Sequence, residues 1–285
     1  MQINATKHKL SAGEIVYGTS LDDCFHPEMA LLLKTVGFDF FFVDTEHSAA
    51  DYPVIQSLCR VAKGAALTPL VRVTDSHAHL ITRALDIGAM GVIVPHVHSP
   101  KITAGIVRAV KFPPEGCRGY GLRSTVTDFC SRPATEELES CNRQTMTVIQ
   151  IECEAGLNRV EEIARVPGVD ALFIGPYDLT LSMGIVGQFE HPRFWKAVAR
   201  VLQACSRAGI AGGLQTSSLA MLRRARECGA RLLMYANDTS VLLEGYRAAM
   251  RELKVKGTHA GAPEQVTPPR HRAGAIGSKG GAGSS

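Results

Sequence analysis

The segment that decides the fold is Val148-Ile149-Gln150-Ile151-Glu152-Cys153-Glu154, in which a short apolar run ends in acidic residues. A second segment repeats this arrangement, Phe173-Ile174-Gly175-Pro176-Tyr177-Asp178. Short β-branched and apolar runs of this kind are typical of buried strands in a parallel sheet. In each segment an acidic residue falls where a helix should begin. Two carboxylates at such strand ends could converge on one hard metal ion.

The same alternation of short apolar runs and amphipathic runs continues along the chain. Strands are expected at 15–19, 38–44, 67–73, 91–94, 147–152, 171–175, 210–214 and 231–235. Helices are expected at 27–36, 52–63 (closed by Gly64), 76–87, 100–110, 155–165, from 178, at 192–208, 217–227 and 240–253. Regular alternation implies parallel strands, and eight such units fit a closed (β/α)8 TIM barrel better than an open sheet. The chain contains no G-x-G-x-x-G, which argues against a Rossmann fold.

Composition favours one domain with a tail. The chain has 285 residues, 45% of them hydrophobic, and no linker-like stretch before about residue 250. We therefore expect residues 1–253 to form the barrel. Residues 254–285 are basic and rich in Gly, Ala, Pro and Ser, so a disordered tail is expected. The net charge of +4 lies in this tail, and the remainder has 26 basic and 26 acidic residues, so no nucleic-acid surface is expected.

Cysteine usage and hydropathy bear on the compartment. The eight cysteines are scattered without a C-x-x-C pair, which favours free thiols in a reducing cytoplasm over a disulfide framework. No apolar run approaches the roughly 18 residues of a membrane span, and no apolar signal region is evident near the N-terminus. We expect a cytoplasmic protein with no membrane partner.

Two other strands carry candidate catalytic residues. Asp44, Glu46 and His47 follow the second strand, where an imidazole beside two carboxylates could act as a general base. The alternative is a helix-capping cluster with a surface histidine. Arg72 lies in the otherwise apolar third strand, where its charge must meet a buried carboxylate or an anion in a pocket.

The carboxylates that could bind a metal are Glu152 and Asp178. Gln150 and Glu152 are two residues apart on a strand, so their side chains share one face, towards the barrel axis. Asp178 could equally cap its own helix. No nearby set of Cys or His completes a zinc site, so Mg2+ or Mn2+ with water and substrate oxygens is favoured. Backbone N–H groups at the start of the helix after Gly175 would suit a substrate carboxylate.

Four further residues stay open. His96 and His98 could lie on one side of a strand end and bind a metal, but no third ligand is nearby. Arg118 and Arg123, in the long segment between 111 and 143, could close over an anion or contact a neighbouring subunit.

Six motifs that carry these residues follow one another along the chain, and as a set they are specific. They are Asp44-x-Glu46-His47, Arg72, Leu85-Asp86-Ile87-Gly88-Ala89, Pro113-Pro114-x-Gly116-x-Arg118-Gly119, Gln150-Ile151-Glu152 and Gly175-Pro176-x-Asp178-Leu179. Over about residues 18–248, the chain resembles the HpcH/HpaI aldolase family of class II pyruvate aldolases.

The resemblance implies a (β/α)8 fold and a divalent ion, Mg2+, Mn2+ or Co2+, held by Glu152 and Asp178. It implies that Arg72 contacts the keto oxygen of the substrate and that His47 acts as the base, paired with Asp44. It also implies a homo-oligomer, a trimer or a hexamer built from trimers. The other positions that it assigns are Gln150 near the metal, Gly175, Pro176 and Tyr177 at the substrate, Asp86 near the active site of a neighbouring subunit, and Glu46 beside the site.

The activity implied is reversible cleavage of a 4-hydroxy-2-oxo acid to pyruvate and an aldehyde through a pyruvate enolate. No lysine stands at a strand end, which argues against a Schiff base. Tyr177 and Cys153 replace smaller or more polar residues, and Tyr177 could reshape the aldehyde pocket. One alternative is a lyase of the citrate-lyase branch that acts on thioesters of the malyl-CoA or citramalyl-CoA kind. Another is a non-catalytic barrel that binds 2-oxo acids.

Overall fold

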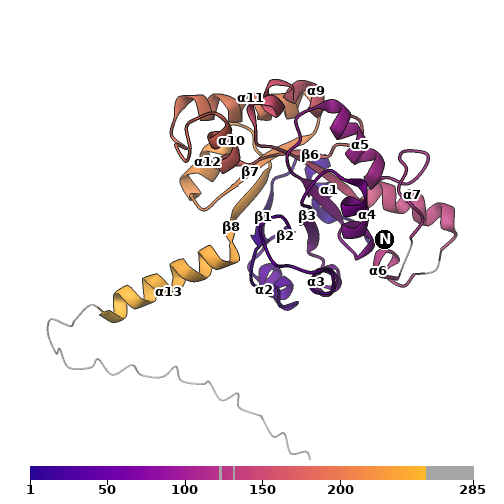
Figure 1. Ribbon diagram of the computed structural model, residues 1–285. Coiled ribbons are helices and arrows are strands. Elements are labelled where there is room, and N and C mark those ends of the chain that lie inside the picture. The colour runs from indigo at the N-terminus through magenta and orange to yellow at the C-terminus, as the bar shows by residue number, and fades with distance from the viewer. Residues whose placement is uncertain (122–123, 131, 255–285) are drawn as a thin grey trace, which may run out of the picture. The chain divides into compact units, whose positions relative to one another are not determined.

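The computed structural model describes residues 1–121, 124–130 and 132–254, and it confirms the predicted closed barrel (Figure 1). In this part of the chain, eight parallel strands pair in sequence order, and the last pairs with the first. Each lies within two residues of its predicted limits. The strands are β1 (Val16–Leu21), β2 (Phe40–Asp44), β3 (Thr68–Arg72), β4 (Gly91–Val94), β5 (Met146–Ile151), β6 (Ala171–Ile174), β7 (Ala211–Thr216) and β8 (Leu232–Asn237).

Helices α2 to α12 lie in the connections between successive strands, α1 precedes the first strand and α13 follows the last (Figure 1). The predicted helix at 155–165 is two helices that meet at Arg159, and a polar segment of the long connection after β4 forms α7. The helices are α1 (Ala5–Ser11), α2 (Met29–Thr35), α3 (Tyr52–Gly64), α4 (Ala78–Asp86), α5 (Pro100–Val110), α6 (Ser124–Thr127), α7 (Ala134–Gln144), α8 (Glu154–Asn158), α9 (Val160–Ala164), α10 (Pro176–Ser182), α11 (Pro192–Ala208), α12 (Leu219–Glu227) and α13 (Asp238–Lys254).

Two apolar layers follow from the two-residue period of the strands. Along β2, Phe40 and Phe42 belong to the cluster inside the barrel, whereas Phe41 and Val43 pack in the layer shared with the helices. Successive side chains of a strand point to opposite faces, so an all-apolar strand fills both layers. This is why a nearly continuous apolar run such as 38–43 predicts a strand buried on both sides.

Helix α1, which the sequence patterns did not predict, closes the amino-terminal end of the barrel. Its Leu10 joins the inner apolar cluster. The Thr6 hydroxyl donates to Thr68 Oγ1 over 2.8 Å, and the Asn4 amide donates to the Met90 carbonyl over 3.1 Å. These bonds tie the helix to residues at the starts of β3 and β4. The opposite end of the barrel, where the strands finish, remains open for a site.

The ending of α3 differs from expectation. Gly64 is the last helical residue, and the turn that follows places Ala66 in the left-handed region with φ 54°. The chain therefore leaves this helix at an alanine, although glycine adopts that conformation at lower cost.

The chain divides into a unit of residues Met1–Gly245 and a second unit that begins at Tyr246. The expected boundary between residues 253 and 254 remains a prediction, and the tail expected at 255–285 lies outside the described residues. Among the described helices, none combines the length and the apolar character needed to cross a membrane.

The inner layer should carry much of the stability. Leu70 is fully buried inside the barrel, whereas Leu31 on α2 is 47% exposed. Leu70→Ala should lower the free energy of unfolding by about 2–5 kcal/mol because it leaves a cavity in a packed core. Leu31→Ala, the matched control, should change it by about 0.5 kcal/mol or less. Urea denaturation followed by circular dichroism measures both, and equal losses in the two variants would contradict the assigned layers.

Candidate active site

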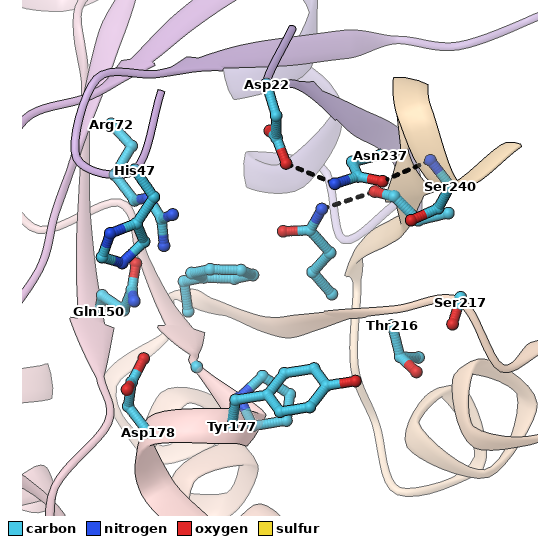
Figure 2. A pocket seen from close by; sticks show the side chains of 15 residues that line it. Asp22, His47, Arg72, Gln150, Tyr177, Asp178, Thr216, Ser217, Asn237 and Ser240 are labelled. Carbon is cyan, nitrogen blue, oxygen red and sulfur yellow. Dashed lines mark hydrogen bonds between the residues drawn. The ribbon is translucent and has the colours of Figure 1, made fainter. Parts of the chain in front are cut away.

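A cavity of about 420 Å3 opens at the carboxyl ends of the strands (Figure 2). Side chains from both halves of the barrel line it, which is the usual position of an active site in this fold. Seven of the residues singled out from the sequence line this cavity: His47, Arg72, Gln150, Gly175, Pro176, Tyr177 and Asp178.

Asp44 and Arg72 form a two-bond ion pair at the mouth of the barrel. They are register partners at the ends of β2 and β3. Arg72 donates from Nε to Asp44 Oδ1 over 2.9 Å and from Nη2 to Oδ2 over 2.6 Å. The guanidinium also lies 5.7 Å from the ring centre of Phe42. This bidentate geometry fixes the plane of the guanidinium, and Arg72 still lines the pocket.

The pair sets the protonation of both groups. Burial raises the pKa of Asp44, but the hydrogen bonds and charge of Arg72 outweigh burial and hold that pKa below its ordinary value. Burial lowers the pKa of Arg72, and the bonds and charge of Asp44 more than reverse this. Arg72 therefore meets a buried carboxylate and faces the pocket as well, so the two alternatives left open by the sequence are compatible.

His47 and Asp44 share no hydrogen bond within the described residues, although the charge interaction with His47 contributes to the lowered pKa of Asp44. Asp44 Oδ1 accepts from the Glu46 backbone N–H over 2.9 Å, and both of its oxygens bind Arg72. The carboxylate beside His47 is Glu46, whose Oε1 lies 3.7 Å from His47 Nε2. The His47 ring is 64% exposed, whereas Glu46 is largely buried. The site thus holds an accessible imidazole beside a buried acid, with Asp44 committed to the arginine.

Gln150 and Glu152 share one face of β5 and its extension, as predicted. The Gln150 amide donates to Glu152 Oε2, and both side chains are buried. Gly175 lies against them, because a Cβ there would fall 3.0 Å from Glu152 Oε2 and 3.0 Å from Gln150 Nε2. Glycine at the end of β6 is therefore what allows the carboxylate and the amide to occupy this position.

Asp178 stands in the first turn of α10, near Glu152. The N-cap of this helix is Gly175, with no side-chain bond, so Asp178 does not cap its own helix. Burial raises the pKa of Glu152, and the negative charge of Asp178 raises it further. Hydrogen bonds from Gln150 and from the His96 backbone lower that pKa. Two neighbouring carboxylates of like charge form a site suited to a cation.

His96, which the sequence reasoning discounted, lies between two acidic residues of the site. Its Nε2 is 2.7 Å from Glu46 Oε1, and its Nδ1 is 3.2 Å from Glu152 Oε1. Its backbone N–H also donates to Glu152 Oε1 over 2.5 Å. This position depends on a left-handed backbone, with φ 58° at His96. His98 only contacts the His96 carbonyl, at 3.2 Å.

Two buried side-chain oxygens near this side of the cavity have no hydrogen-bond partner within the described residues. They are Gln150 Oε1 and Glu46 Oε2. No group of three or more His, Cys, Asp or Glu in that same part of the chain could by itself hold a metal ion. A cation bound by Glu152 and Asp178 would therefore need oxygen ligands from water or substrate, which suits a hard ion that retains water.

Asp86 and Arg118 form a second ion pair, away from the cavity lining. Arg118 Nη2 donates to Asp86 Oδ1 over 2.6 Å, and its guanidinium lies 4.6 Å from the ring centre of Phe112. The Arg118 side chain is buried in this pair. Arg123 lies outside the described residues.

Several lining residues were missed by the sequence reasoning. They lie in the last residues of β7 and β8 or in the segments just after β1, β7 and β8, where the same rule about strand ends would have found them. The missed polar residues are Asp22, Gln215, Thr216, Ser217, Asn237 and Ser240.

An acid pair, an imidazole and a fixed arginine at the open end of a (β/α)8 barrel define an enzyme that acts on a small anionic substrate. The family model described as HpcH/HpaI aldolase/citrate lyase matches residues 23–244, and the chain belongs to that family. The predicted family is confirmed, and with it the prediction of an enzyme that forms or breaks carbon–carbon bonds.

Individual relatives agree with this. The hydroxypyruvate/pyruvate aldolase of Paraburkholderia phytofirmans is 34% identical, over 78% of this chain and 87% of the relative. The enzyme of the same name from Roseobacter denitrificans is 32% identical, over 85% and 93%. The crystal structure of an HpcH/HpaI aldolase from Desulfitobacterium hafniense superposes with a TM-score of 0.85 at 35% identity, covering 88% of this chain and 97% of that one.

The Asp44–Arg72 pair gives a pH-dependent prediction. A carboxyl whose pKa is lowered by folding adds stability above its unfolded pKa and loses it as the pH falls through the folded one. Asp44→Asn should therefore lower the free energy of unfolding at pH 7 by about 3 kcal/mol. This deficit should shrink on acidification below about pH 4.

Urea denaturation across pH 2.5–7, with the exposed Asp23→Asn as control, measures this dependence. A deficit that grows as the pH falls would contradict the assigned charge state.

Proposed function

We propose that the protein is a divalent-metal-dependent aldolase that cleaves 4-hydroxy-2-oxo acids to pyruvate and an aldehyde and catalyses the reverse addition. The observation that carries this proposal is the convergence of Asp178, Arg72 and His47 on one cavity in a member of this family. The buried Glu152 lies beside this cavity, bonded to the lining residue Gln150 and close enough to Asp178 to feel its charge. The aldolase names of the relatives support it.

Glu152 and Asp178 would hold the metal ion, which we propose to be Mg2+, Mn2+ or Co2+. When bound, such an ion supplies a Lewis acid that polarises the keto group of a 2-oxo acid. Gln150 fixes the Glu152 carboxylate through its amide, and its partnerless Oε1 offers an acceptor to a ligated water. Gly175, Pro176 and Tyr177 line the cavity beside these groups.

Arg72 stabilises negative charge that develops on the substrate oxygen. Its Nε and Nη2 are occupied by Asp44, and its Nη1 makes no hydrogen bond within the described residues. A donor that is already oriented stabilises charge in the transition state without having to reorganise. Glu46, 3.5 Å from Arg72 Nε, supports the same guanidinium.

His47 takes the proton from the C4 hydroxyl in cleavage and returns it in addition. Its exposed ring can reach the substrate directly or through one water molecule. A Schiff base would need a lysine at the substrate, and the lining of the cavity, as far as the structure describes it, includes no lysine.

We also propose a cytoplasmic homo-oligomer, a trimer or a hexamer, with Asp86 near a subunit contact. The eight cysteines are free thiols, which is typical of proteins in reducing compartments. The barrel domain would span residues 1–253, followed by the basic tail.

Metal removal should abolish the chemistry. The exchange of pyruvate methyl protons with solvent deuterium, followed by NMR, should fall by at least about 10²-fold after EDTA treatment. Addition of Mg2+, Mn2+ or Co2+ should restore it. Glu152→Gln should fold normally and resist this restoration because it lacks a ligand charge. Glu162→Gln, an exposed matched control, should behave as the parent. Full exchange after exhaustive chelation would rule out the metal assignment.

The arginine gives a separate prediction. Arg72→Lys keeps a charge but loses the planar two-bond contact with Asp44. It should slow pyruvate proton exchange by about 10²–10³-fold in the metal-loaded protein. Arg193→Lys, at an exposed ion pair, is the control. Unchanged exchange in Arg72→Lys would remove the arginine from charge stabilisation. A metal-loaded parent that exchanges no protons would instead favour a thioester lyase, tested by binding of coenzyme A, or a non-catalytic barrel.

A further inference from the structure

The cavity has two dissimilar walls (Figure 2). His47, Arg72, Gln150 and Asp178 lie on one side, and these are the labelled residues to which the proposed chemistry assigns a role. Asp22 lies on the facing side, and dashed lines join it through Asn237 to Ser240. The proposed reaction needs a second substrate, the aldehyde, in the same cavity.

The loop that carries Asp22 is fixed before any ligand binds. The buried Asp238 carboxylate accepts backbone N–H groups of Asp22 at 3.2 Å, Asp23 at 3.1 Å and Cys24 at 2.6 Å. Three amides on one carboxylate hold the turn after β1 rigidly against β8. Asp22 is therefore a preorganised group.

A bulge in β8 brings Asn237 to Asp22. The pairing of β1 with β8 shifts by one residue between Gly18 and Ser20, so that Ser20 lies opposite Asn237, and Ala236 takes a left-handed φ of 50°. A bulge of this kind re-aims the side chains beside it. Asn237 Nδ2 then donates to Asp22 Oδ2 over 2.5 Å, while its Oδ1 accepts the Ser240 N–H over 2.9 Å.

Two side-chain oxygens on this wall that have no partner within the described residues, one of Asp22 and that of Gln215, are hydrogen-bond acceptors. Asp22 Oδ1 is buried and has no hydrogen-bond partner within the described residues. Gln215 uses its amide nitrogen on Ser20 Oγ at 2.8 Å and the Ala236 carbonyl at 2.5 Å, so its oxygen is left for the cavity it lines. The guanidinium of Arg72 and the imidazole of His47 are on the facing wall.

Such a wall discriminates among aldehydes. An alkyl chain would leave buried acceptors without hydrogen bonds, which costs binding energy. A terminal carboxylate would meet the charge of Asp22 with no cation beside it. A hydroxyl group satisfies an acceptor at once.

We propose that Asp22 and Gln215 bind a hydroxyl group of the aldehyde, so that this enzyme selects short, uncharged hydroxyaldehydes. This inference rests on the proposed function. It assigns the wall formed by β1, β7 and β8 to the aldehyde and the facing wall to the 2-oxo acid.

The test uses the full-length, metal-loaded enzyme with pyruvate and aldehydes matched in length. The pairs are glycolaldehyde with acetaldehyde and glyceraldehyde with propanal, and glyoxylate serves as the charged probe. The ratio of kcat/KM within each pair is measured by NMR. In the parent it should favour the hydroxyaldehyde, and it should fall about 10- to 100-fold in Asp22→Leu. Gln215→Met is the second variant, and the exposed Asp23→Leu, whose ratio should equal that of the parent, is the control.

The outcomes separate this inference from the proposed function. If the unmutated, metal-loaded enzyme exchanges no pyruvate protons, the proposed function itself is contradicted. A parent that exchanges protons but prefers glyoxylate, or whose ratios persist in both Asp22→Leu and Gln215→Met, overturns the assignment of this wall. Because each ratio is taken within one variant, partial loss of folded enzyme cancels.

Discussion

The structure of the site depends on one buried ion pair, that of Asp44 with Arg72. A charged arginine that is largely removed from water is costly unless it meets an opposite charge. The register of β2 with β3 places Asp44 beside Arg72 and so provides that charge. The same contact that satisfies the charge also orients the guanidinium towards the cavity. One interaction thus satisfies a buried charge and orients the arginine to which we assign charge stabilisation, while Glu46 lies beside His47.

Much of this could be read from the sequence because two simple rules operate in a parallel barrel. Apolar runs fill both layers, and polar residues at the ends of strands meet at one mouth. These rules gave the barrel and predicted that Arg72, Gln150 and Asp178 lie at its mouth, where they line the cavity. They could not give the position of His96, which depends on a left-handed backbone at a residue that is not glycine.

The sequence rules could not predict contacts between the two ends of the chain either. Asp22 and Asn237 are 215 residues apart and meet only because the barrel closes, with a bulge that sets their register. Helix α1 was missed for a related reason. Its seven residues have a weak pattern of their own, and their burial comes from the barrel floor that they cover.

That covered floor has a kinetic consequence. With Leu10 filling the amino-terminal end, the cavity can exchange its contents only through the mouth. Gln150 and Glu152 are buried, whereas Tyr177 stands exposed at the rim. In the proposed aldolase, both substrates would therefore enter and leave past the same rim.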